Sequence, residues 1–62
     1  MSDVALLIGG RSYTVACADG EEDHILELAA MIDERLSRMG TNLSHMEAKN
    51  LLFAALMLAD EV

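Results

Sequence analysis

The residues able to carry chemistry are few and lie far apart along the chain. His24, His45 and Cys17 are its only imidazoles and its only thiol. Their spacing matches no zinc site. A catalytic histidine needs a nucleophile or a second titrating group beside it, and the sequence places none next to His24 or His45. We interpret both as solvated surface residues and Cys17 as a small buried apolar residue, so we predict no enzyme and no cofactor.

Two further clusters are explained by local structure. The four carboxylates within residues 19–23 lack the spacing of an EF-hand loop. They lie where a helix is predicted to begin, and acidic side chains stabilise the positive end of a helix dipole. Gly9-Gly10 is not part of a P-loop and is typical of a tight hairpin turn instead. We therefore predict neither a metal site nor a phosphate site.

Arg11 is harder to assign. It is the only basic residue among the first 34 and follows the predicted turn, so its side chain projects from a hairpin tip. One interpretation is a solvated turn charge. The other is a contact with an acidic partner surface, which the fork geometry of a guanidinium suits.

The first elements are predicted to be two strands, at residues 3–8 and 11–17. The second strand alternates with period two, as a half-buried strand does. Gly9 and Gly10 tolerate the positive φ angles of a two-residue turn. Residues 3–17 are therefore predicted to form an antiparallel hairpin.

A helix is predicted over residues 20–39, with Asp19 as its N-cap and Glu22 at N3. Its apolar residues fall on a single face, which predicts packing against a core. This stripe consists of Ile25, Leu28, Ala29, Ile32, Leu36 and Met39.

Gly40 supplies the left-handed position that ends this helix. Arg35 and Arg38 are expected to lie in the last turn and interact with the helix dipole, and Glu34 and Arg38 form an i, i+4 pair. Because residues 40–43 form a short connector, the two helices are expected to be antiparallel neighbours.

The second helix is predicted over residues 44–62 and to continue past Val62. Ser44 and Glu47 have the spacing of a capping box. Residues 51–59 are nine consecutive apolar residues, so this helix must be covered on every side, partly by another chain. The predicted dimer interface consists of Leu51, Phe53, Ala54, Leu56, Met57 and Leu58.

Composition limits the classes of function. Sixty-two residues form one small domain, 1–62. The core of such a domain gives only marginal stability by itself, so oligomerisation is expected. The formal charge of −7, with four basic residues, disfavours nucleic acids and anionic membrane surfaces. Nine apolar residues are too few to cross a bilayer, which takes about 20, and there is no basic segment typical of a signal peptide. A cytoplasmic protein that binds other proteins is predicted.

In order, these segments resemble the ZapA family of cell-division proteins. The resemblance rests on the hairpin Ile-Gly-Gly-Arg-Ser-Tyr-Thr-Val, the helix start Asp-Gly-Glu-Glu-Asp-His-Ile, the stretch Ile-Asp-Glu-Arg-Leu, and Leu-Leu-Phe-Ala-Ala-Leu-Met-Leu-Ala-Asp-Glu in the second helix. No single segment is specific, but the ordered set spans essentially the whole chain.

The resemblance implies an α+β, ββαα head that forms a homodimer. In such proteins a long coiled coil follows the head and joins dimers into tetramers, and here the second helix would be only its beginning. It also implies a non-enzymatic protein that binds FtsZ, bundles its filaments and supports the Z-ring at the division site in the cytoplasm, with Arg11 matching the family's FtsZ-contacting arginine. The alternative is a small acidic dimeric regulatory protein of the antitoxin kind, which would bind a basic partner.

Overall fold

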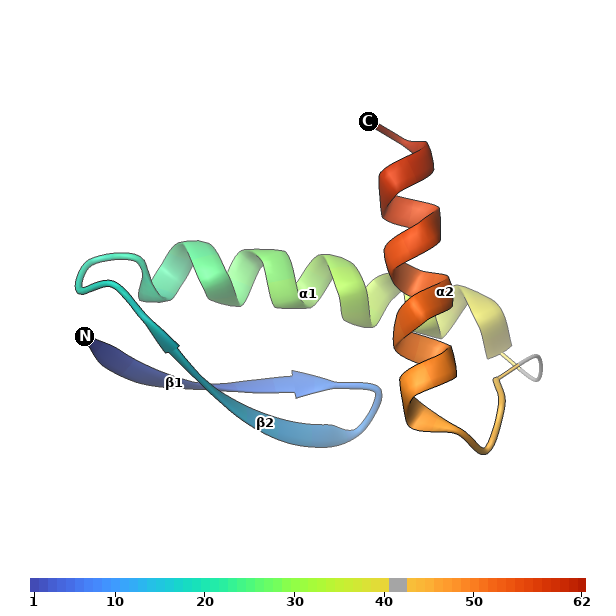
Figure 1. Ribbon diagram of the computed structural model, residues 1–62, viewed down its shortest axis with the longest axis horizontal. Coiled ribbons are helices and arrows are strands. Elements are labelled where there is room, and N and C mark those ends of the chain that lie inside the picture. The colour runs from blue at the N-terminus through green and yellow to red at the C-terminus, as the bar shows by residue number, and fades with distance from the viewer. Residues whose placement is uncertain (41–42) are drawn as a thin grey trace.

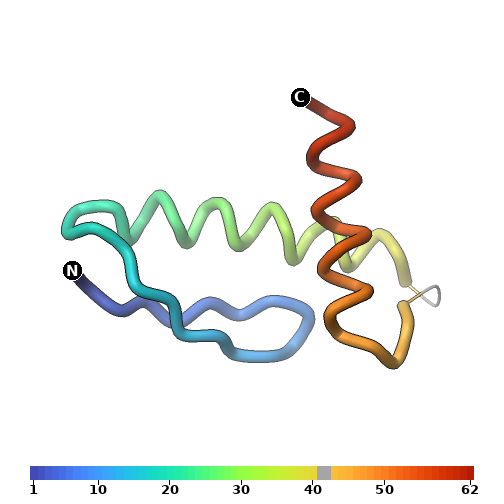
Figure 2. The backbone as a smooth tube through the Cα atoms, in the orientation of Figure 1, coloured from blue at the N-terminus to red at the C-terminus, as the bar shows by residue number. Residues whose placement is uncertain are grey.

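The computed structural model describes residues 1–40 and 43–62, which form an antiparallel hairpin followed by two helices (Figures 1 and 2). The predicted α+β fold is confirmed. The elements are β1 (Ser2–Ile8), β2 (Arg11–Cys17), α1 (Glu22–Met39) and α2 (Glu47–Asp60). Residues 41–42 of the predicted connector lie outside the described residues. Helix α1 runs along the hairpin, whereas α2 lies beside the hairpin turn and crosses α1.

The hairpin turn depends on its two glycines. Gly9 and Gly10 have φ angles of 61° and 79°, as a two-residue turn with both central residues left-handed requires. The turn places Ile8 opposite Arg11 and sets the register of the whole ladder. With this register, alternate side chains of β1 face α1, while Leu7 on the other face is 68% exposed.

The start of α1 differs from the predicted cap. Glu21 precedes the helix without capping it through a side chain. Asp19, predicted as the N-cap, instead accepts a hydrogen bond from Ser2 Oγ at 2.7 Å, because the end of β2 brings it beside the start of β1. Glu22 accepts the Gly20 N–H at 2.7 Å. Hydrogen bonds to backbone N–H groups, first its own, and to Ser2 hold the pKa of Glu22 below its ordinary value.

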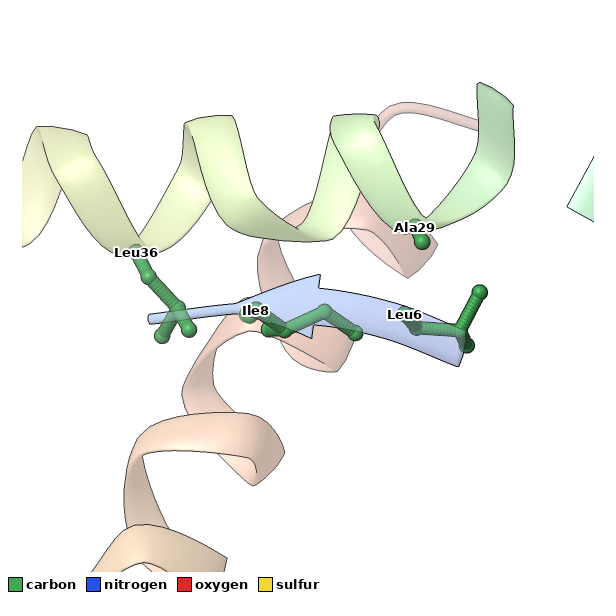
Figure 3. Packing of buried hydrophobic residues seen from close by; sticks show 5 residues of the cluster. Leu6, Ile8, Ala29 and Leu36 are labelled. Atoms are coloured by element: carbon green, nitrogen blue, oxygen red, sulfur yellow. The ribbon is translucent and has the colours of Figure 1, made fainter. Parts of the chain in front are cut away.

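The core lies between α1 and the inner row of β1. Ala29 and Leu36 on α1 face Leu6 and Ile8 on β1 (Figure 3), and all four are buried. Ala54 from α2 completes this cluster and is the only one of the five with no exposed surface. The predicted stripe on α1 therefore packs as expected, although Leu28 remains 42% exposed at its edge.

Helix α2 crosses α1 steeply, and the predicted antiparallel arrangement is wrong (Figure 1). The full burial of Ala54 shows where the chain packs most closely against this helix, and a small side chain permits that approach. The crossing leaves the sides of α2 uncovered within the chain. Leu52 and Leu56 are more than half exposed, although the sequence predicts cover on every side.

The predicted capping box at the start of α2 is also wrong. The helix begins at Glu47, three residues later than expected, with Met46 as its N-cap. Asn50 takes the place predicted for Glu47. Its side chain accepts the Ser44 N–H at 2.8 Å and donates to the Ser44 carbonyl at 3.0 Å. Glu47 is thereby left to contact the hairpin tip.

Arg35 ties the far end of α2 to α1. It is 9% exposed, where the sequence predicts only a residue of the last turn interacting with the helix dipole. Its Nε donates to Glu61 Oε2 at 2.7 Å, and its terminal nitrogens bind Glu61 and Glu34. The predicted Glu34–Arg38 pair is confirmed at 2.6 Å. These contacts raise the pKa of the guanidinium, so Arg35 stays charged.

We expect Gly9→Ala to destabilise the fold more than Gly10→Ala. Both substitutions place a side chain at positive φ, which costs about 1–2 kcal/mol. Only at Gly9 would the added methyl meet another group, since its Cβ would lie 3.2 Å from Cδ1 of the buried Leu36. Urea unfolding of the two variants measures the difference, and equal costs would show that Leu36 moves aside freely.

We expect Glu61→Gln to lower the melting temperature at neutral pH and to lose that effect in acid. The hydrogen bonds from Arg35 hold the pKa of Glu61 below its ordinary value of 4.5. A depressed folded-state pKa stabilises the fold above the unfolded pKa, and this contribution disappears as the pH falls through the folded pKa. Melting curves of the wild type and Glu61→Gln should therefore converge progressively below pH 4.5.

Glu27→Gln is the matched control, because it removes an exposed carboxylate from the middle of α1. If Glu27→Gln lost as much stability as Glu61→Gln, the effect would come from the change in net charge and not from the contact with Arg35.

Candidate protein-interaction surfaces

Arg11 lies at the tip of the hairpin, as the sequence predicts. The turn at Gly9 and Gly10 brings it opposite Ile8, at the first position of β2. Its side chain is 70% exposed, so a partner can reach the guanidinium. The structure adds a contact that sequence reasoning missed, since Arg11 Nε lies 3.4 Å from Oε1 of Glu47 at the start of α2.

A small pocket with both polar and apolar lining residues lies beside this ion pair. Its volume is about 210 Å³, and both Arg11 and Glu47 line it. Ser44 and Asn50, joined by their two hydrogen bonds, form part of its wall, and His45 adds an imidazole. The hairpin tip therefore presents a cation next to polar groups, with room for a side chain of another molecule.

An apolar groove opens between the hairpin and α2. Its volume is about 510 Å³ and its lining is almost entirely hydrophobic. It is lined by Leu6, Ile8, Tyr13, Val15, Ile32, Leu51, Ala55 and Leu58. Leu6 and Ile8 are buried, whereas on the α2 side of the groove Leu51 and Leu58 are only half-buried and Ala55 is exposed.

A second apolar hollow, of about 400 Å³, lies at the end of α1. It is lined by Met39, Phe53, Leu56 and Met57. The Lys49 ammonium lies 5.9 Å from the centre of the Phe53 ring, a weak cation–π contact at an exposed site. Exposed apolar groups in continuous hollows, unlike scattered ones, are typical of surfaces that bind other proteins.

The residues predicted to form the dimer interface lie in three different environments. Phe53 and Leu56 are exposed, at 41% and 55%. Leu51, Met57 and Leu58 are half-buried at the edges of the two hollows. Ala54 is fully buried in the chain's own core, so in this conformation no partner can reach it.

The other candidate residues do not converge on a chemical site. His24 is exposed on α1, His45 is exposed in the segment before α2, and Cys17 is buried at the end of β2. Desolvation, followed by the charge of Glu22, raises the pKa of the Cys17 thiol, which disfavours the reactive thiolate. Within residues 1–40 and 43–62, no group of three or more His, Cys, Asp and Glu side chains could hold a metal ion.

The described helices are also too short or too polar to cross a membrane. What the molecule presents is an exposed arginine at a hairpin tip and two apolar hollows along one helix. These features are those of a small α+β domain whose surface is suited to contacts with other proteins.

Comparison with known families identifies this domain further. The family model described as Cell division protein ZapA matches residues 4–62. The chain belongs to the ZapA family, which comprises non-enzymatic cell-division proteins associated with the Z-ring. Comparisons with curated proteins and with solved structures found no match.

Proposed function

We propose that this chain is the head of a ZapA-type protein that binds FtsZ and promotes the bundling of its filaments at the division site in the cytoplasm. The observation that carries the proposal is the position of Arg11 within the matched region. It lies 70% exposed at the tip of a hairpin whose register is set by two glycines. A guanidinium held in this way can bind a carboxylate of FtsZ through two parallel hydrogen bonds.

The proposal includes a homodimer built on α2. The two hollows along this helix, of about 510 and 400 Å³, leave apolar side chains in contact with solvent. A chain of 62 residues has little core to offset such exposure, and a second copy would cover it. A continuation of α2 as a coiled coil would then join dimers into tetramers.

Bundling then follows from multivalency and requires no catalysis. Each copy contributes one Arg11, so a dimer carries two contacts and can hold two filaments. Once one copy is bound, the second meets its site at a high effective concentration. Because the arginine is exposed, dissolved salt should screen this contact.

We expect Arg11→Glu to weaken binding to FtsZ filaments more than Arg38→Glu does. The two substitutions change the net charge equally, and both side chains are well exposed, at 70% and 59%. Only Arg11 lies at the hairpin tip, whereas Arg38 pairs with Glu34 within α1. Co-sedimentation with FtsZ at two salt concentrations measures both variants. Equal losses would identify a general charge effect and would direct attention to the acidic residues 19–23.

We expect Phe53→Glu to convert the dimer to a monomer. The exposed ring lines one of the apolar hollows, and a charge buried without a partner at an interface is strongly destabilising. Helix α2 itself should tolerate the change, because a glutamate there lies one turn from Lys49. Light scattering at micromolar concentration gives the mass. Leu7→Glu, on the outer face of β1, is the control, and an unchanged mass for Phe53→Glu would place the interface elsewhere.

A further inference from the structure

The contact between Arg11 and Glu47 joins the hairpin tip to the first residue of α2. The two residues lie 36 positions apart in the sequence, and the pair is the one ion-pair contact that the structure gives to Arg11 within residues 1–40 and 43–62. Glu47 lies against the Nε edge of the Arg11 guanidinium. That edge takes part in the bidentate recognition of a carboxylate, together with a terminal nitrogen.

The pair is a loose one. Arg11 Nε and Glu47 Oε1 lie 3.4 Å apart without forming a hydrogen bond, and the Arg11 side chain is 70% exposed. Glu47 Oε1 is shielded from solvent and has no hydrogen-bond partner. A carboxylate oxygen in this position has lost its hydration without a full replacement, so displacing it costs little.

We propose that Glu47 is an internal competitor for the FtsZ-binding site, which holds Arg11 against α2 until an acidic side chain of the partner takes its place. This inference rests on the proposed function, since it assigns a regulator to the same arginine. The incoming carboxylate binds the guanidinium from the solvent side, beside the pocket of about 210 Å³ that both residues line. Glu47 then turns outward and regains its hydration.

The competition couples partner binding to the docking of α2 on the hairpin. Whatever weakens the Arg11–Glu47 contact raises the affinity for the partner, and by linkage the bound partner weakens this contact by the same factor. Exposed ion pairs contribute little, so the expected gain on removing the competitor is about two- to fivefold in affinity.

Co-sedimentation with FtsZ filaments at low salt tests the inference with four variants: Glu47→Gln, Arg11→Gln, the double variant that combines them, and Glu27→Gln. Glu47→Gln should bind about two- to fivefold more tightly than the wild type. Glu27→Gln removes the same charge from an exposed site on α1 and measures the general electrostatic effect. In the Arg11→Gln background, Glu47→Gln should produce no gain.

Sedimentation of each variant without FtsZ is subtracted, so that aggregation does not count as binding, and a loss of folded protein cannot then produce a gain in affinity. If Arg11→Gln weakens binding but Glu47→Gln binds no more tightly than Glu27→Gln, the competition is overturned while the proposed contact stands. A gain that persists in the double variant would also overturn it, because the effect would then not pass through Arg11. Wild-type binding by Arg11→Gln would instead overturn the proposed function itself.

Discussion

The close approach of α2 to the core at Ala54 is the contact on which the arrangement of this molecule depends. Ala54 has no exposed surface and packs with the cluster formed by β1 and α1. A small residue at this position lets α2 lie close, but it contributes little apolar area, so the crossing alone gives modest stability. It also leaves some of the larger apolar side chains of α2 outside the core, although Leu51 packs against it. Leu52 and Leu56 are exposed for this reason.

Arginines supply the tertiary contacts that so small a core does not. Arg35 binds Glu61 and Glu34 and thereby ties the far end of α2 to α1, while Arg11 lies beside Glu47 at the near end. The chain carries eleven acidic residues and only four basic ones, so each arginine lies among an excess of carboxylates. The two contacts differ in strength. Arg35 is buried and bidentate, whereas Arg11 is exposed and loosely held, which leaves the hairpin tip as the end that can exchange partners.

The features predicted correctly are those that neighbouring residues determine. The Gly9-Gly10 turn, the alternation along β2 and the apolar stripe of α1 each follow from local geometry, and each is present. The predictions that were wrong concern contacts between residues that lie farther apart in the sequence. Asn50 caps the Ser44 segment although Glu47 has the right spacing, because Glu47 lies against the hairpin tip. Neither the steep crossing of the helices nor the burial of Arg35 leaves a periodic signal in the sequence.

The same distinction explains what the sequence could show of the interaction surface. Its position at a hairpin tip made Arg11 a candidate for partner binding. The residue that its guanidinium contacts within the chain is Glu47, 36 positions further along the sequence. The apolar run of α2 predicted that its side chains are buried by other parts of the protein. Which of them this chain buries is decided by the crossing at Ala54, which the sequence does not reveal. Part of the remaining apolar area lies in the two hollows beside α2. The larger hollow shares Ile8, Tyr13 and Leu51 with the pocket beside Arg11, whereas the hollow at Phe53 shares no lining residue with that pocket. A domain built in this way can pair with a second copy through the helix and still present its hairpin tip to another protein.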